Sequence, residues 1–157
     1  MSVRRIPLFA IVLLPVLVAG CGGDSKSSDE SRLTQTQFVR EGNAVCIRSD
    51  RRVFRIGDLG PNPTPWRETS NAAKKGIDEM AALRPPLAKQ KQFDSMIASA
   101  RELQRAVSDV YTQLVANDPD KARAAQRRAV EADSLIKRKA HSLGLTFCEQ
   151  LLTNWPA

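Results

Sequence analysis

The stretch FDSMIASARELQRAVSDVYTQL, residues 93–114, decides the fold of this chain. Apolar residues recur in it at alternating steps of three and four, a spacing that gathers side chains on one side of a helix. They are Phe93, Met96, Ile97, Ala100, Leu103, Val107, Val110, Tyr111 and Leu114. The helix is expected to be about 40 Å long at 1.5 Å per residue. We interpret the stripe as a core face and not as a cofactor or ligand box, so other helices must cover it.

The segment from about Thr34 to Ile56 has the same periodicity and is predicted to be the first helix. Thr34 and Gln37 have the spacing of a capping box, and Gly57 follows the last apolar residue. The residues expected to face inward are Phe38, Gly42, Val45, Cys46, Ser49, Val53 and Ile56.

A second helix is predicted between two proline-containing stretches. Thr64 is expected to cap it and Pro65 to take its first helical position, and it should end before Pro85-Pro86. Its inward residues are expected to be Trp66, Ala73, Ile77, Met80 and Leu83.

The last long helix is expected to begin with Asp118 as its cap and Pro119 as its first residue. Gly144 suits a left-handed helix end, and Leu145 is the apolar residue that folds back in that motif. Its narrow inward face is rich in alanine and comprises Ala122, Ala125, Ala129, Ala132, Ile136, Ala140 and Leu143.

Four amphipathic segments with short connections and no strand pattern predict an all-α protein, an antiparallel four-helix bundle with a short C-terminal tail over residues 34–157. In this topology the first helix begins where the last one finishes. The tail from Leu145 to Cys148 can therefore turn back onto the first helix. It must run some way along that helix to reach Cys46.

The residues before the bundle have the pattern of an export signal. Met1 to Arg5 form a short start made basic by Arg4 and Arg5, and Ile6 to Val18 are almost wholly apolar. This apolar run is too short to cross a bilayer of about 30 Å, and its two prolines disfavour a helix. Val18-Ala19-Gly20-Cys21 closes the segment with small residues around a cysteine.

These four residues resemble the lipobox of bacterial lipoproteins. The resemblance implies a diacylglyceryl group on the Cys21 thiol, cleavage just before it and an acylated amino terminus. Residues 1–20 would then be a cleaved signal peptide, and residues 21–33, which are largely polar, a flexible tether. The alternative is an ordinary secretory signal in which Cys21 is incidental.

Cys46 and Cys148 remain as a pair near opposite ends of the folded part. Outside the cytoplasm such a pair is most simply a structural disulfide. Closing a loop of about a hundred residues stabilises the fold by roughly 4–5 kcal/mol in the chain-entropy model. A redox-active pair is disfavoured because the two cysteines do not have the Cys-x-x-Cys spacing. A metal site is disfavoured because His141 is the only histidine in the chain and no clustered ligands surround it.

Three short signatures resemble small exported helical proteins of high-GC Gram-positive bacteria, for which no activity is established. They are Asn43-Ala44-Val45-Cys46, Leu83-Arg84-Pro85-Pro86 and Leu143-Gly144-Leu145-Thr146-Phe147-Cys148. The resemblance supports the helical fold and the disulfide, and it implies no activity.

The chain is basic, with 24 Lys and Arg residues against 17 Asp and Glu, and removal of Arg4 and Arg5 leaves 22 basic residues and a net charge of +5. Four arginines fall on one side of the first helix, next to its apolar stripe: Arg48, Arg51, Arg52 and Arg55. They are candidates for binding anionic lipid headgroups or cell-wall polymers. The alternative is a solvated helix face. Nucleic acid is not an expected partner outside the cell.

Sequence patterns of known catalytic sites are missing from the chain. It has no Gly-x-Ser-x-Gly turn, no His-Glu-x-x-His, no phosphate-binding glycine loop and no EF-hand spacing. We therefore expect a non-enzymatic binding or assembly module, without cofactor or metal, anchored by lipid on the extracytoplasmic face of a bacterial membrane. Its partners would be the membrane and an envelope protein or anionic polymer. The alternative is an accessory or enzymatic envelope factor whose site is assembled from scattered residues.

Overall fold

The computed structural model describes residues 32–150, which are helical and contain no strand. Its long helices are α1 (Gln35–Phe54), α2 (Pro63–Ala81), α3 (Gln90–Val115) and α4 (Pro119–Leu143), with a 3-10 turn, η1 (Leu87–Lys89), and a short helix, α5 (Thr146–Glu149). The all-helical prediction is confirmed. The predicted signal peptide, Cys21 and the tether as far as residue 31 lie outside the described residues.

Helix α1 begins as predicted and ends slightly earlier. The Gln37 amide donates to Thr34 Oγ1 at 3.3 Å, and the Gln37 side chain accepts from the Thr34 amide at 2.9 Å. This is the predicted capping box, which satisfies amides that a helix start leaves without partners. The helix ends at Phe54, and Ile56 lies in the following turn before Gly57, whose φ is +86°.

The predicted start of α2 is wrong by two residues. Asn62 is the cap, because its side chain accepts from the Thr64 amide at 3.0 Å, and Pro63 takes the first position. Both Pro63 and Pro65 fit the first turn, where an amide proton has no helical partner to lose. Thr64 is therefore a helical residue and not the cap.

The start and end of α4 are confirmed in detail. Asp118 Oδ1 accepts from the Lys121 amide at 3.1 Å, and Pro119 is the first helical residue. Gly144 ends the helix with φ +79°, and the Leu145 amide then donates to the Ala140 carbonyl at 2.9 Å. This left-handed end turns the chain so that Leu145 is fully buried.

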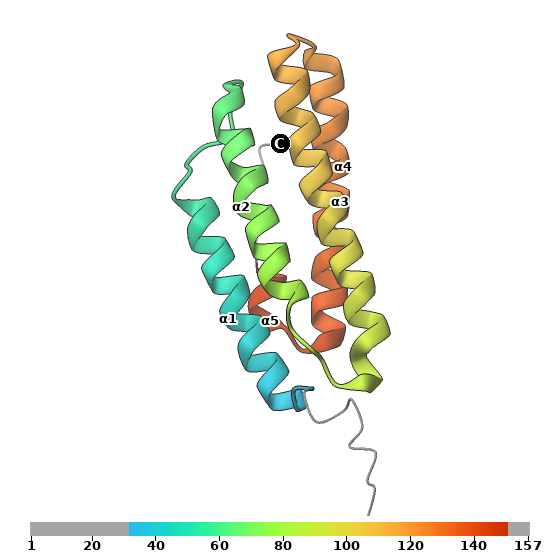
Figure 1. Ribbon diagram of the computed structural model, residues 1–157. Coiled ribbons are helices and arrows are strands. Elements are labelled where there is room, and N and C mark those ends of the chain that lie inside the picture. The colour runs from blue at the N-terminus through green and yellow to red at the C-terminus, as the bar shows by residue number, and fades with distance from the viewer. Residues whose placement is uncertain (1–31, 151–157) are drawn as a thin grey trace, which may run out of the picture.

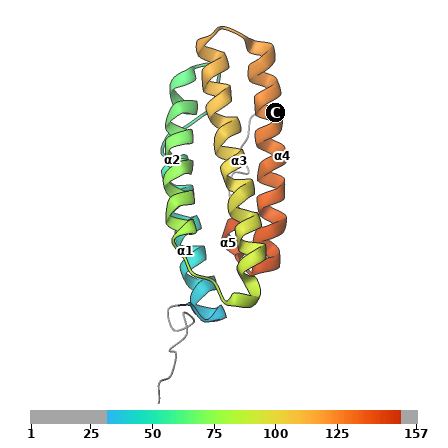
Figure 2. The ribbon, with the colours of Figure 1, turned by 45° about the vertical axis from the view of Figure 1, so that its right-hand side comes forward.

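The long helices lie side by side (Figures 1 and 2), with α3 packed against both α2 and α4, and α1 against α2. The start of α1 is next to the end of α4, because Gln35 Nε2 donates to the Leu143 carbonyl at 3.2 Å. It is also next to the end of α2, where the Leu33 amide donates to the Arg84 carbonyl at 2.9 Å. Leu33, which the sequence assigned to the tether, packs partly buried against the core.

The core consists of two clusters along the length of the helices. One gathers around Phe38 and Phe93, whose rings meet edge to face at 5.5 Å, and includes the disulfide. The other gathers around Trp66 and the alanines of α4, and small alanine side chains let α3 and α4 approach closely. Trp66 was expected to face inward, and its burial in this cluster confirms that prediction.

Candidate functional site

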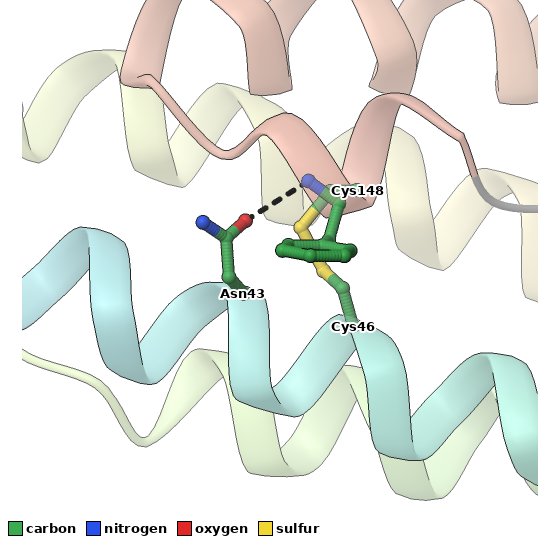
Figure 3. The surroundings of a disulfide bond; sticks show 4 residues. Asn43, Cys46 and Cys148 are labelled. Carbon is green, nitrogen blue, oxygen red and sulfur yellow. Dashed lines mark hydrogen bonds between the residues drawn. A yellow bond between two sulfur atoms is a disulfide. The ribbon is translucent and has the colours of Figure 1, made fainter.

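Helix α5, which follows α4 in the chain, is joined to α1 by a disulfide. Cys46 and Cys148 are bonded, with their Cα atoms 5.3 Å apart and 102 residues between them in sequence. Beside them, the Phe147 amide donates to Asn43 Oδ1 at 3.1 Å (Figure 3). The tail therefore runs along α1 as far as Cys46, as the sequence demanded.

Leu145 determines how closely this tail lies against α1. A Cβ atom added to Gly42 would be 2.6 Å from Leu145 Cδ2, which is too close for real atoms. Only glycine leaves room for Leu145 at this point of α1. Since α5 packs against both α1 and α4, it occupies the space between these helices alongside residues 42–46 of α1.

Beyond α5, the long helices enclose an open space that we call the apolar cleft. It has a volume of about 110 Å³ and is lined by residues of α1, α2, α3, α4 and α5. Its walls are chiefly apolar and include Val45, Val53, Ile77, Ile97, Ile136 and Cys148. An apolar concavity with few polar groups is the usual form of a binding site for an apolar ligand group.

Small side chains leave this space open. Ser49, Ala73, Gly76 and Ala100 all line the cleft where larger residues would fill it. At Gly76 the crossing of α1 and α2 is so close that an added Cβ would overlap the Ser49 hydroxyl. The helices cannot approach further there, and the gap behind them persists.

Two carboxylates, Asp50 and Asp133, also line the cleft. Asp133 is only 5 % exposed, and its Oδ2 lies 2.7 Å from Lys137 Nζ. Burial raises the pKa of Asp133, and the hydrogen bond and charge of Lys137 offset this only in part. Asp133 is the buried ionisable side chain of the site, whereas Asp50 is exposed.

The predicted arginine stripe divides into two pairs. Arg48 Nε lies 3.4 Å from Glu79 Oε2, and Arg52 Nη2 lies 2.5 Å from Glu79 Oε1, so both arginines join α1 to α2. Arg51 and Arg55 are exposed, and Arg55 Nε donates to the Arg51 carbonyl at 3.0 Å. Half of the stripe thus pairs with a carboxylate of the protein itself.

Glu79 is held ionised by these two arginines. Partial burial acts to raise its pKa, but the hydrogen bonds and charges of Arg52 and then Arg48 together outweigh burial and lower the pKa. These two ion pairs link the last two turns of α1 to the last turn of α2.

Other candidate chemistry is sparse. His141 is 79 % exposed, and its Nδ1 lies 3.1 Å from Glu149 Oε1 on α5. Within residues 32–150 no cluster of His, Cys, Asp and Glu could hold a metal ion. None of the helices described there has the length of apolar sequence that a bilayer span requires.

Comparisons with protein-family models, with curated proteins and with solved structures give no match to this chain. The site is therefore interpreted from its own residues.

The apolar cleft and the burial of Asp133 were not predicted from the sequence. One signal was present: Asp133 is four residues after Ala129 and three before Ile136, so it falls on the inward stripe of α4. The small residues Ser49, Ala73 and Ala100 on three predicted inward faces were a second signal.

Proposed function

We propose that this protein is a lipid-anchored binding module of a bacterial cell envelope, built on an antiparallel four-helix bundle. The lipobox-like Val18-Ala19-Gly20-Cys21 supports the anchor. The Cys46–Cys148 disulfide supports an extracytoplasmic location, because such bonds persist in oxidising compartments. The side-by-side packing of α1 to α4 supports the bundle.

The observation that carries the binding role is the apolar cleft. Each of α1 to α5 contributes to its lining, and its residues are chiefly apolar. We infer that the cleft accepts an apolar group of an envelope partner, where burial of apolar area supplies the free energy of binding. The arginine stripe is the weaker candidate, because Arg48 and Arg52 already pair with Glu79.

The anchor is tested by intact mass spectrometry of protein purified from its own membranes. The expected mass is that of residues 21–157 with acyl chains on Cys21, less two hydrogens that reduction restores. Cys21→Ser should abolish acylation and release the protein from the membrane fraction. An unlipidated chain or free thiols at Cys46 and Cys148 would contradict the proposal.

The binding role is tested with the hydrophobic fluorescent probe N-phenyl-1-naphthylamine. Ala100 lines the cleft, and Ala100→Leu should fill it and reduce probe fluorescence severalfold. The matched control is Ala98→Leu, an exposed position on the same helix, which should leave the signal unchanged. Equal fluorescence with and without Ala100→Leu, also when Leu151 and Leu152 are replaced by serine so that no apolar tail competes for the cleft, would show that the cleft does not accept apolar groups.

A second candidate function, an accessory or enzymatic envelope factor, is favoured by the two carboxylates of the cleft. A carboxyl group whose pKa is raised by burial, as at Asp133, is suited to general acid catalysis. To test it, isolated envelope fractions are incubated with the purified protein, and new products are sought by mass spectrometry. A product that Asp133→Asn abolishes would favour this function over binding alone.

A further inference from the structure

We propose that the apolar cleft is the docking site of this chain's own residues 151–157. The proposal rests on where the described chain reaches the cleft, on the length and composition of the seven residues that follow, and on the shape of the cleft. It is independent of the lipid anchor.

The first step concerns the space between α1 and α4. Helix α5 packs against both of them, and Cys148 on α5 bonds to Cys46 on α1. The cleft continues from this point, because Cys148 lines it together with Val53 further along α1 and Asp133 and Ile136 on α4. It therefore extends the space that α5 fills.

The second step is one of length. Cys148 lines the cleft at its end nearest α5, and the described chain ends at Gln150, only two residues further on. From Cys46 to Val53 the cleft follows α1 for about 10 Å, at 1.5 Å per residue. Seven residues span about 10 Å as a helix and up to about 23 Å when extended. Either conformation can cover the cleft.

The third step is chemical. Leu151, Leu152 and Trp155 supply three large apolar side chains, and residues 151–157 contain no charged side chain. Burying them against the chiefly apolar walls therefore takes no charged side chain of the tail out of water. A covalently tethered segment also has an effective concentration on the order of millimolar. It therefore outcompetes a dilute free ligand of similar affinity.

Docking of the tail gives the cleft a built-in competitor. If the proposed function is correct, an envelope partner must displace residues 151–157 before its apolar group can bind. The apparent affinity of the partner is then its intrinsic affinity multiplied by the fraction of molecules in which the tail leaves the cleft free. This consequence depends on the proposed function, whereas the docking itself does not.

The direct test is photo-crosslinking in the mature, oxidised protein. Benzoylphenylalanine in place of Leu152 reacts readily with methionine, and Met80 and Met96 both line the cleft. We expect intramolecular crosslinks to these residues or to their neighbours in the lining. The control places the same group at Phe147, which is half exposed on α5 and should not give these crosslinks. Crosslinks to other faces, crosslinks only between molecules, or no crosslinks would overturn the proposal.

A second test uses Trp155 as the reporter. Trp66 is 1 % exposed, so acrylamide quenching reports chiefly on Trp155. We expect little quenching in the wild type and in Ala98→Leu, and clear quenching in Ala100→Leu, where the added side chain displaces the tail.

Probe binding gives a further test. The full-length variant Leu151→Ser/Leu152→Ser should bind severalfold more N-phenyl-1-naphthylamine than the wild type. Strong quenching in the wild type, or unchanged probe binding in the serine variant, would contradict docking even if membrane attachment is confirmed.

Discussion

Leu145 packs into the space that Gly42 leaves on the surface of α1, with its Cδ2 atom 2.6 Å from where a Cβ would be. Leu145 is fully buried, so it cannot move aside without disturbing the residues around the disulfide. This contact fixes α5 against α1. It follows from the glycine of one helix and from the left-handed turn at Gly144 that ends another.

Gly42→Ala should therefore destabilise the protein. Overpacking a core typically costs about 1–3 kcal/mol, and alanine recovers up to about 1 kcal/mol of helix propensity, so we expect a net loss of about 1–2 kcal/mol. The measurement is the midpoint of urea unfolding. The control is Gly60→Ala, where an added Cβ meets nothing within 4 Å. Equal midpoints for the two variants would show that Leu145 relaxes freely.

This contact also shows what the sequence could predict. Gly42 was placed on the inward face and Leu145 at the helix end, because both assignments depend only on local spacing and on glycine's access to positive φ. The helices, the capping box at Thr34 and the cap at Asp118 were predicted for the same reason. Local signals settled each of these.

The remainder depends on contacts between distant segments. The pairing of Arg48 and Arg52 with Glu79 requires the register of α1 against α2, which no local pattern contains. The apolar cleft likewise results from small residues of separate helices meeting at one level of the fold. Even the cap of α2 was misjudged, because two prolines fit its first turn equally well.

Loss of the disulfide should be the largest single effect on stability. Cys46→Ser/Cys148→Ser opens a loop with a sequence separation of 102 residues, and the chain-entropy model gives a loss of roughly 4–5 kcal/mol. Urea unfolding with and without reductant measures it. The double variant and the reduced wild type should have the same midpoint. A loss below about 1 kcal/mol would mean that the unfolded chain is already compact.

Hydrogen exchange should locate this effect at α5. The helix has only four residues and is held by the disulfide, by Leu145 and by the bond from the Phe147 amide to Asn43. A helix this short is not stable alone. In Cys46→Ser/Cys148→Ser its amides should exchange much faster than those of α3. Equal acceleration in α3 would instead indicate global unfolding.

The pairing of Glu79 with Arg52 should make stability depend on pH. The pKa of Glu79 is lowered from its ordinary value of 4.5, so its contribution is present above that pH and is lost as pH falls through the folded pKa. Glu79→Gln should cost less than about 1 kcal/mol at pH 7, since the pair is partly exposed, and progressively less as pH falls through the folded pKa. Urea unfolding across this pH range measures the difference.

Neighbouring arginines provide the matched control for this pair. Arg52→Gln removes the shorter contact to Glu79 and should lower stability at pH 7. Arg51→Gln changes an exposed side chain of the same helix and should stay within about 0.5 kcal/mol of the wild type. Equal effects of both substitutions would indicate a general charge effect on α1.

Asp133 should have the opposite dependence on pH. Burial raises its pKa above the ordinary value of 3.8, so the folded protein holds this proton to a higher pH than the unfolded chain. Its contribution to stability is therefore lost as pH rises from about 3.8 through the folded pKa.

Asp133→Asn removes the buried charge and leaves Lys137, which retains partial exposure, able to reach solvent. We expect the variant to be more stable than the wild type at pH 7, because a carboxyl whose pKa is raised on folding destabilises the folded protein when it is ionised. The gain should disappear near pH 3, where the wild-type carboxyl is protonated. Asp50→Asn, at an exposed carboxylate of the same cleft, should change stability by less than about 0.5 kcal/mol. A loss of stability in Asp133→Asn at neutral pH would mean that the ion pair with Lys137 outweighs the cost of burial.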